Sequence, residues 1–274
     1  MQAVSDALRA AGIACDTAWS AIMCPPGGLL LDDARPNDYT HLIWACGPLS
    51  GTPVRQTAAR FAGCTRIAVG VSVVDPADPA VTAFDTVIAR DRPGADGLLD
   101  LAARPVPDAV PVVGVFLSAG QREYGHRRRH DEVNDALGRW LGSRDLARLN
   151  LNTRLDPRDW RLGATPAQVE SVVRRLDVVV TTRLHGLVLA LKNGVPALAV
   201  DPVAGGAKVS AQARAWAWPV LAADQVSEGA LDAVLADALS AAGRSRAGTA
   251  AGLARGAGAG QLAELLAAVL PDPA

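Results

Sequence analysis

Lysine is nearly missing from this chain of 274 residues: only two of its 27 basic residues are lysine, Lys192 and Lys208. Acidic and basic residues almost cancel, with a formal net charge of -1, so no overall field favours nucleic acid or an anionic membrane. Both lysines lie in or just after residues 178–201. A lysine offers a compact point charge that suits a phosphate, and placement by chance is the alternative interpretation.

Long hydrophobic runs are also missing. None approaches the ~20 residues of a membrane span, and the first twelve residues resemble an amphipathic helix rather than a secretory signal. We therefore expect a cytoplasmic protein without a membrane span. The few cysteines show no CxxC spacing, which favours buried free thiols over a metal site or a disulfide. They are Cys15, Cys24, Cys46 and Cys64.

Short β-branched runs alternate with helical stretches along the chain. Continuous apolar strands separated by helices indicate parallel sheets that are covered on both faces. The predicted class is therefore α/β with Rossmann-like units. The expected strands are Ile13–Trp19, His41–Ala45, Arg66–Val73, Phe84–Ala89, Val110–Leu117, Asp177–Thr182 and Pro196–Asp201. The expected helices are Pro53–Ala62, His130–Leu141, Thr165–Arg175, His185–Asn193 and Lys208–Trp216.

A proline-rich stretch, residues 103–111, interrupts this alternation and predicts a domain boundary. We place an N-terminal Rossmann-like lobe at residues 1–107 and a C-terminal lobe at residues 108–274. Near the end, residues 240–260 are rich in glycine, alanine and arginine and predict a loose connection. Residues 261–270 predict a last amphipathic helix that docks on a lobe.

The stretch "VVVTTRLHGLVLALKNGVPALAVD", residues 178–201, carries the strongest chemical signal. A buried strand ends at Thr182 and a helix begins at His185, so the turn between them lies at the carboxyl edge of a parallel sheet. Arg183 and His185 are then placed beside a helix N-terminus, which attracts anions. Gly186 leaves room for a ligand near the backbone. A guanidinium binds carboxylate or phosphate, and a histidine beside an anion can act as a general acid.

Two other interpretations remain open for these polar residues. In the first, His185 is structural and caps the helix, while Arg183 pairs with an acidic residue. In the second, the basic stretch Arg122–His130, which follows the strand Val110–Leu117, contacts substrate at that strand end. Its more ordinary interpretation is a solvated loop, to which His130 would belong.

At these residues the chain resembles the polysaccharide pyruvyl transferase family. The long match is "LDVVVTTRLHGLVLALKNGVPALAVD" followed by "GGAKVSAQARAW". Weaker similarities are "HLIWACGPLSG", "RIAVGVSV", "FDTVIARD" with Arg90 and Asp91 at its end, and "PVPDAVP" with Asp108. The resemblance covers roughly residues 40 to 220.

The resemblance implies two Rossmann-like lobes in a GT-B-like arrangement and phosphoenolpyruvate as the donor. The N-terminal lobe would be the acceptor side, and the C-terminal lobe would carry the donor site. The partners would be this donor and a hydroxyl-bearing acceptor, and no cofactor or metal would be needed. Homo-oligomer formation is left open. His185 would be the general acid, and Arg183 would act with it. The substrate-binding residues would be Lys208, Gly186, Thr182, Arg90 and Arg122.

The chain also departs from the family pattern. It begins at the helix that would follow the family's first strand, so the resemblance implies a shortened N-terminal lobe. Two alternative functions keep the fold: a GT-B glycosyltransferase with a nucleotide-sugar donor, and a non-catalytic binding protein. A glycosyltransferase usually has a carboxylate pair or a base-stacking platform after this turn. The corresponding span here offers Asp201 and Lys208 with no glutamate between them, which disfavours this alternative.

Overall fold

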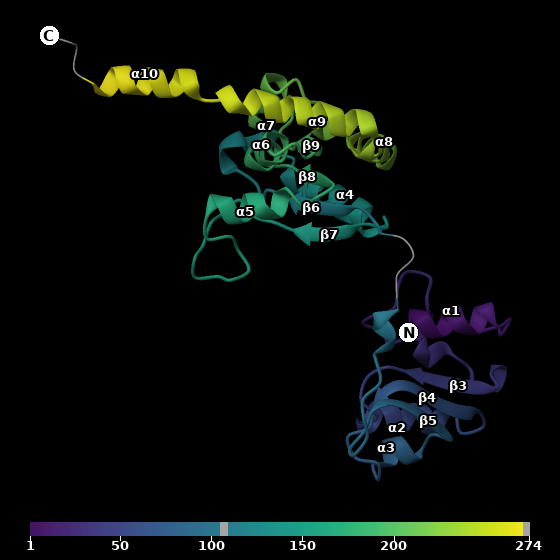
Figure 1. Cartoon of the computed structure of the whole chain (residues 1–274). Helices are drawn as coiled ribbons and strands as arrows, with labels where there is room; N and C mark the ends of the chain where they lie inside the picture. Colours follow the sequence, from purple (N-terminus) through teal and green to yellow (C-terminus); the bar gives the residue numbers. More distant parts are fainter. Residues whose placement is uncertain (105–108, 271–274) are drawn as a thin grey trace. The chain divides into compact units, whose positions relative to one another are not determined.

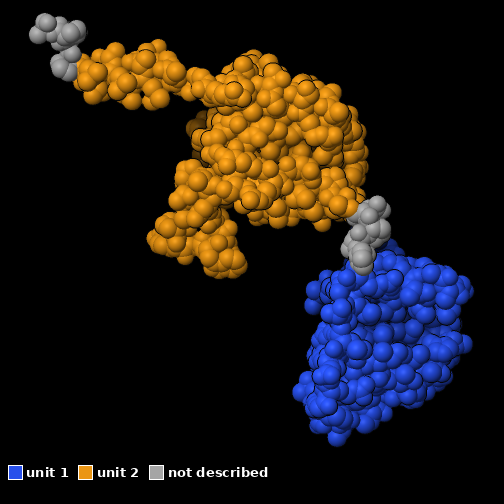
Figure 2. Space-filling model, viewed as in Figure 1, with its two compact units in different colours: residues 1–107 blue, residues 108–274 orange. Residues whose placement is uncertain are grey.

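The computed structural model describes residues 1–104 and 109–270. The chain divides into two compact units, residues 1–107 and residues 108–274, coloured blue and orange in Figure 2. The domain boundary expected between residues 107 and 108, and Asp108 itself, lie outside the described residues.

Unit 1 is built on a three-stranded parallel sheet in the order β3-β4-β5. Its strands are β3 (His41–Ala45), β4 (Thr65–Ser72) and β5 (Thr86–Asp91), and the helices α2 (Gly51–Arg60) and α3 (Pro79–Thr82) follow β3 and β4. Val54, Ala58, Ala68 and Val71 form part of the core between helices and sheet. The remaining elements are α1 (Gln2–Ala10), β1 (Ala18–Trp19), β2 (Leu29–Leu30) and the 3-10 turns Leu31–Asp33, Pro36–Asp38 and Leu101–Ala103.

Unit 2 contains a five-stranded, fully parallel sheet in the order β10-β9-β8-β6-β7. Its strands are β6 (Val112–Phe116), β7 (Ala147–Asn150), β8 (Val178–Thr181), β9 (Ala197–Asp201) and β10 (Leu221–Ala222). The central strands β8 and β9 are buried along their whole length, as expected for a sheet covered on both faces.

Helices cover both faces of this sheet because alternate strand residues point to opposite sides. Val178 and Val180 pack with α4 and α8, whereas Val179 packs with α5, α6, α7 and α9. The helices are α4 (His130–Gly142), α5 (Pro166–Val173), α6 (Leu184–Lys192), α7 (Lys208–Ala215), α8 (Glu228–Leu239), α9 (Ala241–Leu253) and α10 (Ala259–Val269), with 3-10 turns at Arg122–Arg127, Ala223–Gln225 and Ala254–Gly256. The predicted α/β class with parallel sheets is confirmed.

The chain leaves β6 and β8 in opposite directions along the sheet. From β6 it passes through α4 to β7, and from β8 it passes through α6 to β9 on the other side. Since β6 and β8 are neighbours, their carboxyl ends form a topological switch point, where ligands bind in open α/β sheets.

Two expectations about the C-terminal part are wrong. Residues 240–260 are not a loose connection, because α9 forms there and packs against α6 and α8 with Ala247 and Ala250 buried. Alanine favours the helix and its small side chain allows close packing. The last helix, α10, forms as expected, but none of its residues is buried, so it does not dock on unit 2. Figure 1 shows it extending away from α9.

Within residues 1–104 and 109–270, no helix combines the length and the apolar character needed to cross a bilayer.

Candidate functional site

The turn after β8 is fixed by the hydroxyl of Thr181. Its Oγ1 accepts from the backbone N–H of Arg183 at 2.9 Å, and it donates toward the carbonyl oxygens of Arg183 (3.0 Å) and Phe116 (3.2 Å). Because Phe116 ends β6, this one buried hydroxyl joins the ends of both switch-point strands. The chain then enters α6 with Arg183 as the residue before the first helical turn.

The Arg183 side chain crosses to the loops that follow β6 and β7. Its Nε donates to the carbonyl of Leu117 at 2.7 Å. Its Nη1 donates to Oδ1 of Asn152 at 3.0 Å and to Oγ1 of Thr153 at 3.2 Å. Within the described residues, Nη2 has no partner. These bonds hold the guanidinium at the carboxyl edge of the sheet with one nitrogen still available.

All partners of the Arg183 guanidinium are uncharged. The side chain is half-buried, and among the described residues no carboxylate forms an ion pair with it. Burial lowers its pKa from the ordinary value of an arginine, because the charged form loses hydration. A guanidinium still stays protonated in a protein. The site therefore holds a partly dehydrated positive charge that an anion would stabilise.

His185 lies in the first turn of α6 and is exposed. No hydrogen bond involves its ring in the part of the chain that the structure describes. The Arg183 side chain does not cap α6, and no described side chain accepts from the amides of Leu184, His185 and Gly186. Free amides at a helix N-terminus add to the attraction for an anion. The interpretation of His185 as a capping residue therefore finds no contact to support it.

Gly186 and Thr182 have packing roles in this turn. A Cβ on Gly186 would lie 2.3 Å from Oγ1 of Thr181 and 3.0 Å from Cβ of Phe116, so glycine is needed for α6 to approach the strands. Thr182 is buried, and its Oγ1 accepts from the N–H of Ser118 at 2.8 Å. The space expected for a ligand at Gly186 is filled by protein atoms.

Lys208 begins α7, at the same edge of the sheet. Its side chain is half-buried, and it makes no hydrogen bond or ion pair with a described residue. The neighbouring Asp201 is fully buried, and its carboxylate accepts from the amides of Val203, Ala207 and Ser210 and from the Ser210 hydroxyl. Asp201 therefore fixes the loop before α7. Lys192 differs, because its Nζ lies 2.7 Å from Oε1 of Glu170.

The basic stretch after β6 is more ordered than a solvated loop. Arg127 donates from Nε to the carbonyl of Ala204 at 2.9 Å and from Nη2 to the carbonyl of Gly206 at 2.7 Å. These bonds attach the stretch to the loop between β9 and α7. Arg122 is the first residue of this stretch and is exposed. Its side chain forms no hydrogen bond or ion pair with a described residue. It lies close in sequence to the switch point.

His130 is a residue that the sequence interpretation placed wrongly. It is the first residue of α4, only 1% of its surface is exposed, and its Nδ1 is buried without a hydrogen-bond partner. Burial, followed by the charge of Arg128, lowers its pKa. Asn134, one helical turn later, donates to the Ser118 carbonyl while its Oδ1 stays unpartnered. A histidine at a helix start gives no sequence signal of burial when arginines precede it.

Arg90 lies in unit 1, where each nitrogen of its guanidinium group donates a hydrogen bond. Its Nε donates to Asp91 and its Nη1 to Asp100, while its Nη2 donates to Oγ of Ser72. The two carboxylates raise its pKa. The arrangement corresponds to a structural ion pair at the end of β5, and no nitrogen of Arg90 is left without an acceptor.

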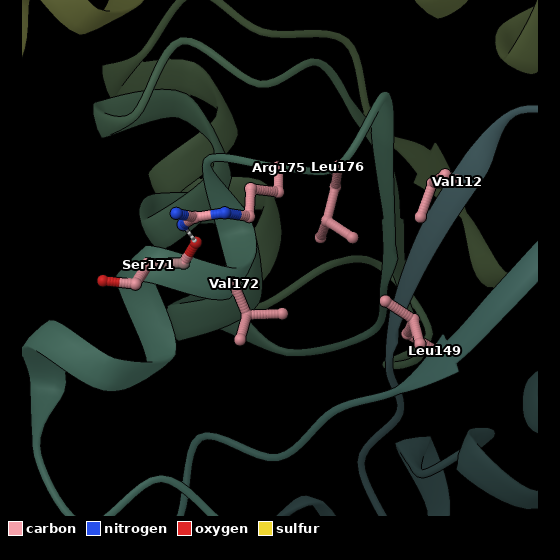
Figure 3. Close-up of a pocket in the computed structure, with 6 residues that line it drawn as sticks. All are labelled: Val112, Leu149, Ser171, Val172, Arg175 and Leu176. Atoms are coloured by element: carbon pink, nitrogen blue, oxygen red, sulfur yellow. Dashed lines mark hydrogen bonds between the residues drawn. The ribbon is translucent and has the colours of Figure 1, made fainter.

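A hollow of about 430 Å³ in unit 2 does not lie at the switch point. It is lined mainly by apolar side chains, among them Val112 at the start of β6 and Leu176 just before β8 (Figure 3). These positions belong to the amino ends of the strands, opposite the edge where α/β sheets bind ligands. Arg175, the basic residue in its wall, donates to the Ser171 carbonyl. A smaller hollow of about 250 Å³ lies between the end of β7, the following loop and α5.

Residues 26–202, more than half of the chain, match the family model described as polysaccharide pyruvyl transferase. The matched range includes the turn from Thr182 to Gly186 and ends before Lys208. A search of curated proteins finds no match.

Proposed function

This chain belongs to the polysaccharide pyruvyl transferase family, and we propose that it transfers a pyruvyl group from phosphoenolpyruvate to hydroxyls of a saccharide or another small acceptor. The single observation that carries this proposal is the half-buried Arg183 guanidinium, whose partners are all neutral. It lies at the switch point of unit 2, beside the free amides of α6 and the exposed His185. A small donor with several negative charges suits this site.

The donor would be held by positive charge on neighbouring elements. The free Nη2 of Arg183 and the first amides of α6 can donate hydrogen bonds to one anionic group of the phosphoenolpyruvate. Lys208 at the start of α7 can hold the other, because α6 and α7 pack together and both begin at the carboxyl edge. An ammonium on a flexible stem suits a phosphate as a point charge. Arg122 can approach the same edge from the loop after β6.

His185 would supply the proton that starts the reaction. Its imidazolium protonates the methylene carbon of phosphoenolpyruvate, which leaves the next carbon with oxocarbenium character. An acceptor hydroxyl adds to that carbon and gives its proton to the imidazole of His185. The C–O bond to phosphate then breaks, a second hydroxyl adds to the same carbon, and its proton passes to the departing phosphate. The products are a ketal that carries the new methyl group and inorganic phosphate. General acid catalysis of this kind contributes typically 10²–10⁴-fold.

The test is the release of inorganic phosphate from phosphoenolpyruvate in the presence of saccharides with neighbouring hydroxyls. We expect release to depend on the acceptor and to fall at least about 100-fold in His185→Ala. His41→Ala is the matched control, since His41 is an exposed histidine whose Nδ1 contacts Oγ1 of Thr40 in unit 1. It should leave the rate unchanged.

Equal release by His185→Ala and the unaltered chain would contradict His185 as the acid. Consumption of a nucleotide sugar without phosphate release from phosphoenolpyruvate would favour the glycosyltransferase alternative instead. The fixed position of Asp201, which accepts four hydrogen bonds from its own loop and α7, argues against that alternative, because the carboxylate is not available to a sugar nucleotide.

A further inference from the structure

The connection between β7 and α5 presents a tryptophan to solvent. We call residues 152–163 the Trp160 loop. Trp160 is 92% exposed, in a chain with only six tryptophans. Figure 1 shows the loop extending beyond the sheet and α5. The exposed ring offers a large, rigid apolar face on which a ligand can stack.

The loop is ordered by its own carboxylates. Asp156, 7% exposed, accepts from the amide of Arg158 at 3.0 Å and from the guanidinium groups of Arg154 and Arg158. The amide of Asp156 in turn donates to the carbonyl of Gly163 at 3.2 Å, which closes the loop. Asp159 holds Arg161 through two bonds of 2.8 Å. These hydrogen bonds fix the backbone that carries Trp160. A ligand that binds to Trp160 therefore loses less free energy to the ordering of the loop.

Beside Trp160 lies the hollow of about 250 Å³. This is smaller than the ~300–1,000 Å³ of pockets that enclose a drug-sized ligand, so it suits a single ring. Apolar and amide side chains both line it: Leu151, Leu162, Val169, Val172, Asn150 and Gln168. Among the described residues, no partner engages the Asn150 side chain. Apolar walls with a few amides match a sugar ring, which has both C–H faces and hydroxyls.

The charge of the loop adds a preference. Three arginines, Arg154, Arg158 and Arg161, have side chains 66%, 85% and 72% exposed, whereas the two aspartates they pair with are 9% and 29% exposed. The loop therefore has an excess of one positive charge, and its guanidinium groups are much more exposed to solvent than its carboxylates. A saccharide that carries an anionic group would meet this positive surface.

The same loop contacts the candidate donor site directly. Asn152 and Thr153, its first two residues, accept the hydrogen bonds from Nη1 of Arg183. A ligand on the Trp160 loop would therefore be bound by the loop whose base orients the donor arginine.

We propose that the Trp160 loop and its hollow bind the acceptor, an acidic saccharide whose ring stacks on Trp160 and whose anionic group meets Arg158 and Arg161. This assignment rests on the proposed function, because it names the acceptor of that reaction. It adds a binding site within unit 2 for a substrate class that the donor residues do not specify.

The test measures equilibrium binding of saccharides without phosphoenolpyruvate, by titration calorimetry. A glucuronate-containing oligosaccharide is compared with the glucose oligosaccharide of the same length. Trp160→Ala should weaken binding of both by about fivefold to tenfold, whereas Trp160→Phe should retain most of it. Arg161→Gln should weaken only the acidic ligand, by about threefold. Leu155→Ala in the same loop and Arg139→Gln on α4 are the matched controls, since both residues are exposed and lie outside the hollow.

Unchanged binding in Trp160→Ala, or no binding of either saccharide by the unaltered chain, would overturn the assignment. The results distinguish failure of the Trp160 site from failure of the proposed reaction. Saccharide binding through Trp160 without phosphate release would leave the site standing and remove the reaction. Phosphate release with an acceptor KM that Trp160→Ala does not raise would leave the reaction standing and remove the site.

Discussion

Nη1 of Arg183 donates to Oδ1 of Asn152 across 3.0 Å, which joins two residues that are 31 positions apart in the chain. The same Oδ1 accepts from the amide of Arg154 at 2.9 Å. Asn152 therefore orients a guanidinium without neutralising it. A carboxylate at this position would hold the guanidinium equally well, but it would compensate the charge that attracts an anion.

Replacing Asn152 tests this distinction. Asn152→Asp should raise the KM for phosphoenolpyruvate by about tenfold, because a fixed carboxylate competes with the donor for Arg183. Asn152→Ala should raise it less, since the guanidinium loses one orienting bond but keeps its charge. Steady-state kinetics with phosphate release as the readout gives both values. An Asn152→Asp variant with the donor KM of the unaltered chain would count against an anion at Arg183.

Arg183→Met should abolish activity while leaving the stability of the chain nearly unchanged. The substitution removes a half-buried charge that has only neutral partners, so the lost hydrogen bonds and the relieved dehydration offset one another. We expect a change in the free energy of unfolding of at most about 1 kcal/mol, with loss of donor turnover. Urea denaturation and phosphate release measure the two effects.

Arg144→Met is the matched comparison for that experiment. Arg144 donates to Asp232 through Nε (2.8 Å) and Nη2 (2.7 Å), and Asp232 also accepts from the indole of Trp140. The hydrogen bonds from Arg144, followed by the one from Trp140, lower the pKa of the Asp232 carboxyl to about 2. Losing Arg144 should reduce stability and leave turnover unchanged. The reverse pattern in the two variants would mean that Arg183 is a structural residue.

Gly186→Ala should destabilise unit 2. The added Cβ would lie 2.3 Å from Oγ1 of Thr181, inside the seam between β8 and α6, and overpacking of this kind costs about 1–3 kcal/mol. Gly138→Ala in α4 is the control, because nothing lies within 4 Å of its new Cβ and alanine is the better helix former. It should be neutral or stabilising by up to about 1 kcal/mol. Urea denaturation measures the free energy of unfolding of both variants. A Gly186→Ala variant as stable as Gly138→Ala would contradict the close packing at Gly186.

The burial of His130 predicts a pH dependence of stability. Its pKa in the folded chain lies below the value of about 6.5 in the unfolded chain, so the unfolded state takes up the proton first as pH falls. Arg128 and Lys208 push the pKa down, whereas Asp131 and Asp201 oppose them. Stability is therefore fully present above about pH 7 and decreases below about pH 6.5, by at most about 1.4 kcal/mol per pH unit for one proton.

His130→Phe should remove this part of the decrease. The difference between the variant and the unaltered chain is measured by urea denaturation at several values from pH 7.5 to pH 5. Carboxylates with lowered pKa, such as Asp232, lose their contribution only at lower pH and do not interfere in this range. Parallel stability curves for the two proteins would contradict a neutral, buried His130.

The central strands of the fold could be predicted because they are short, apolar and separated by helices. The predicted strand His41–Ala45 coincides with β3, and the predicted starts of α4 and α7 at His130 and Lys208 also agree. β7 was missed, since Ala147–Asn150 forms an edge strand with every residue exposed and therefore has no apolar pattern. α9 was missed because its glycines and arginines are typical of a loop, whereas its alanines pack closely in the folded chain.

The part of the site that depends only on neighbouring residues in the sequence could be predicted. A strand, a tight turn and a helix place Arg183 and His185 at the carboxyl edge, and that placement needs no distant contact. The partners of Arg183 depend on the order of strands in the sheet, so Asn152 and Thr153 carried no signal. The same holds for Gly186, whose neighbours Thr181 and Phe116 come from two different strands.

The carboxylate of Asp201, with its four hydrogen bonds, gives the loop after β9 a fixed shape. The backbone that carries Lys208 is thereby immobilised, while the four-carbon stem of the lysine keeps its rotational freedom. In the proposed reaction, the ammonium group of Lys208 would be able to follow the departing phosphate while the loop keeps its position.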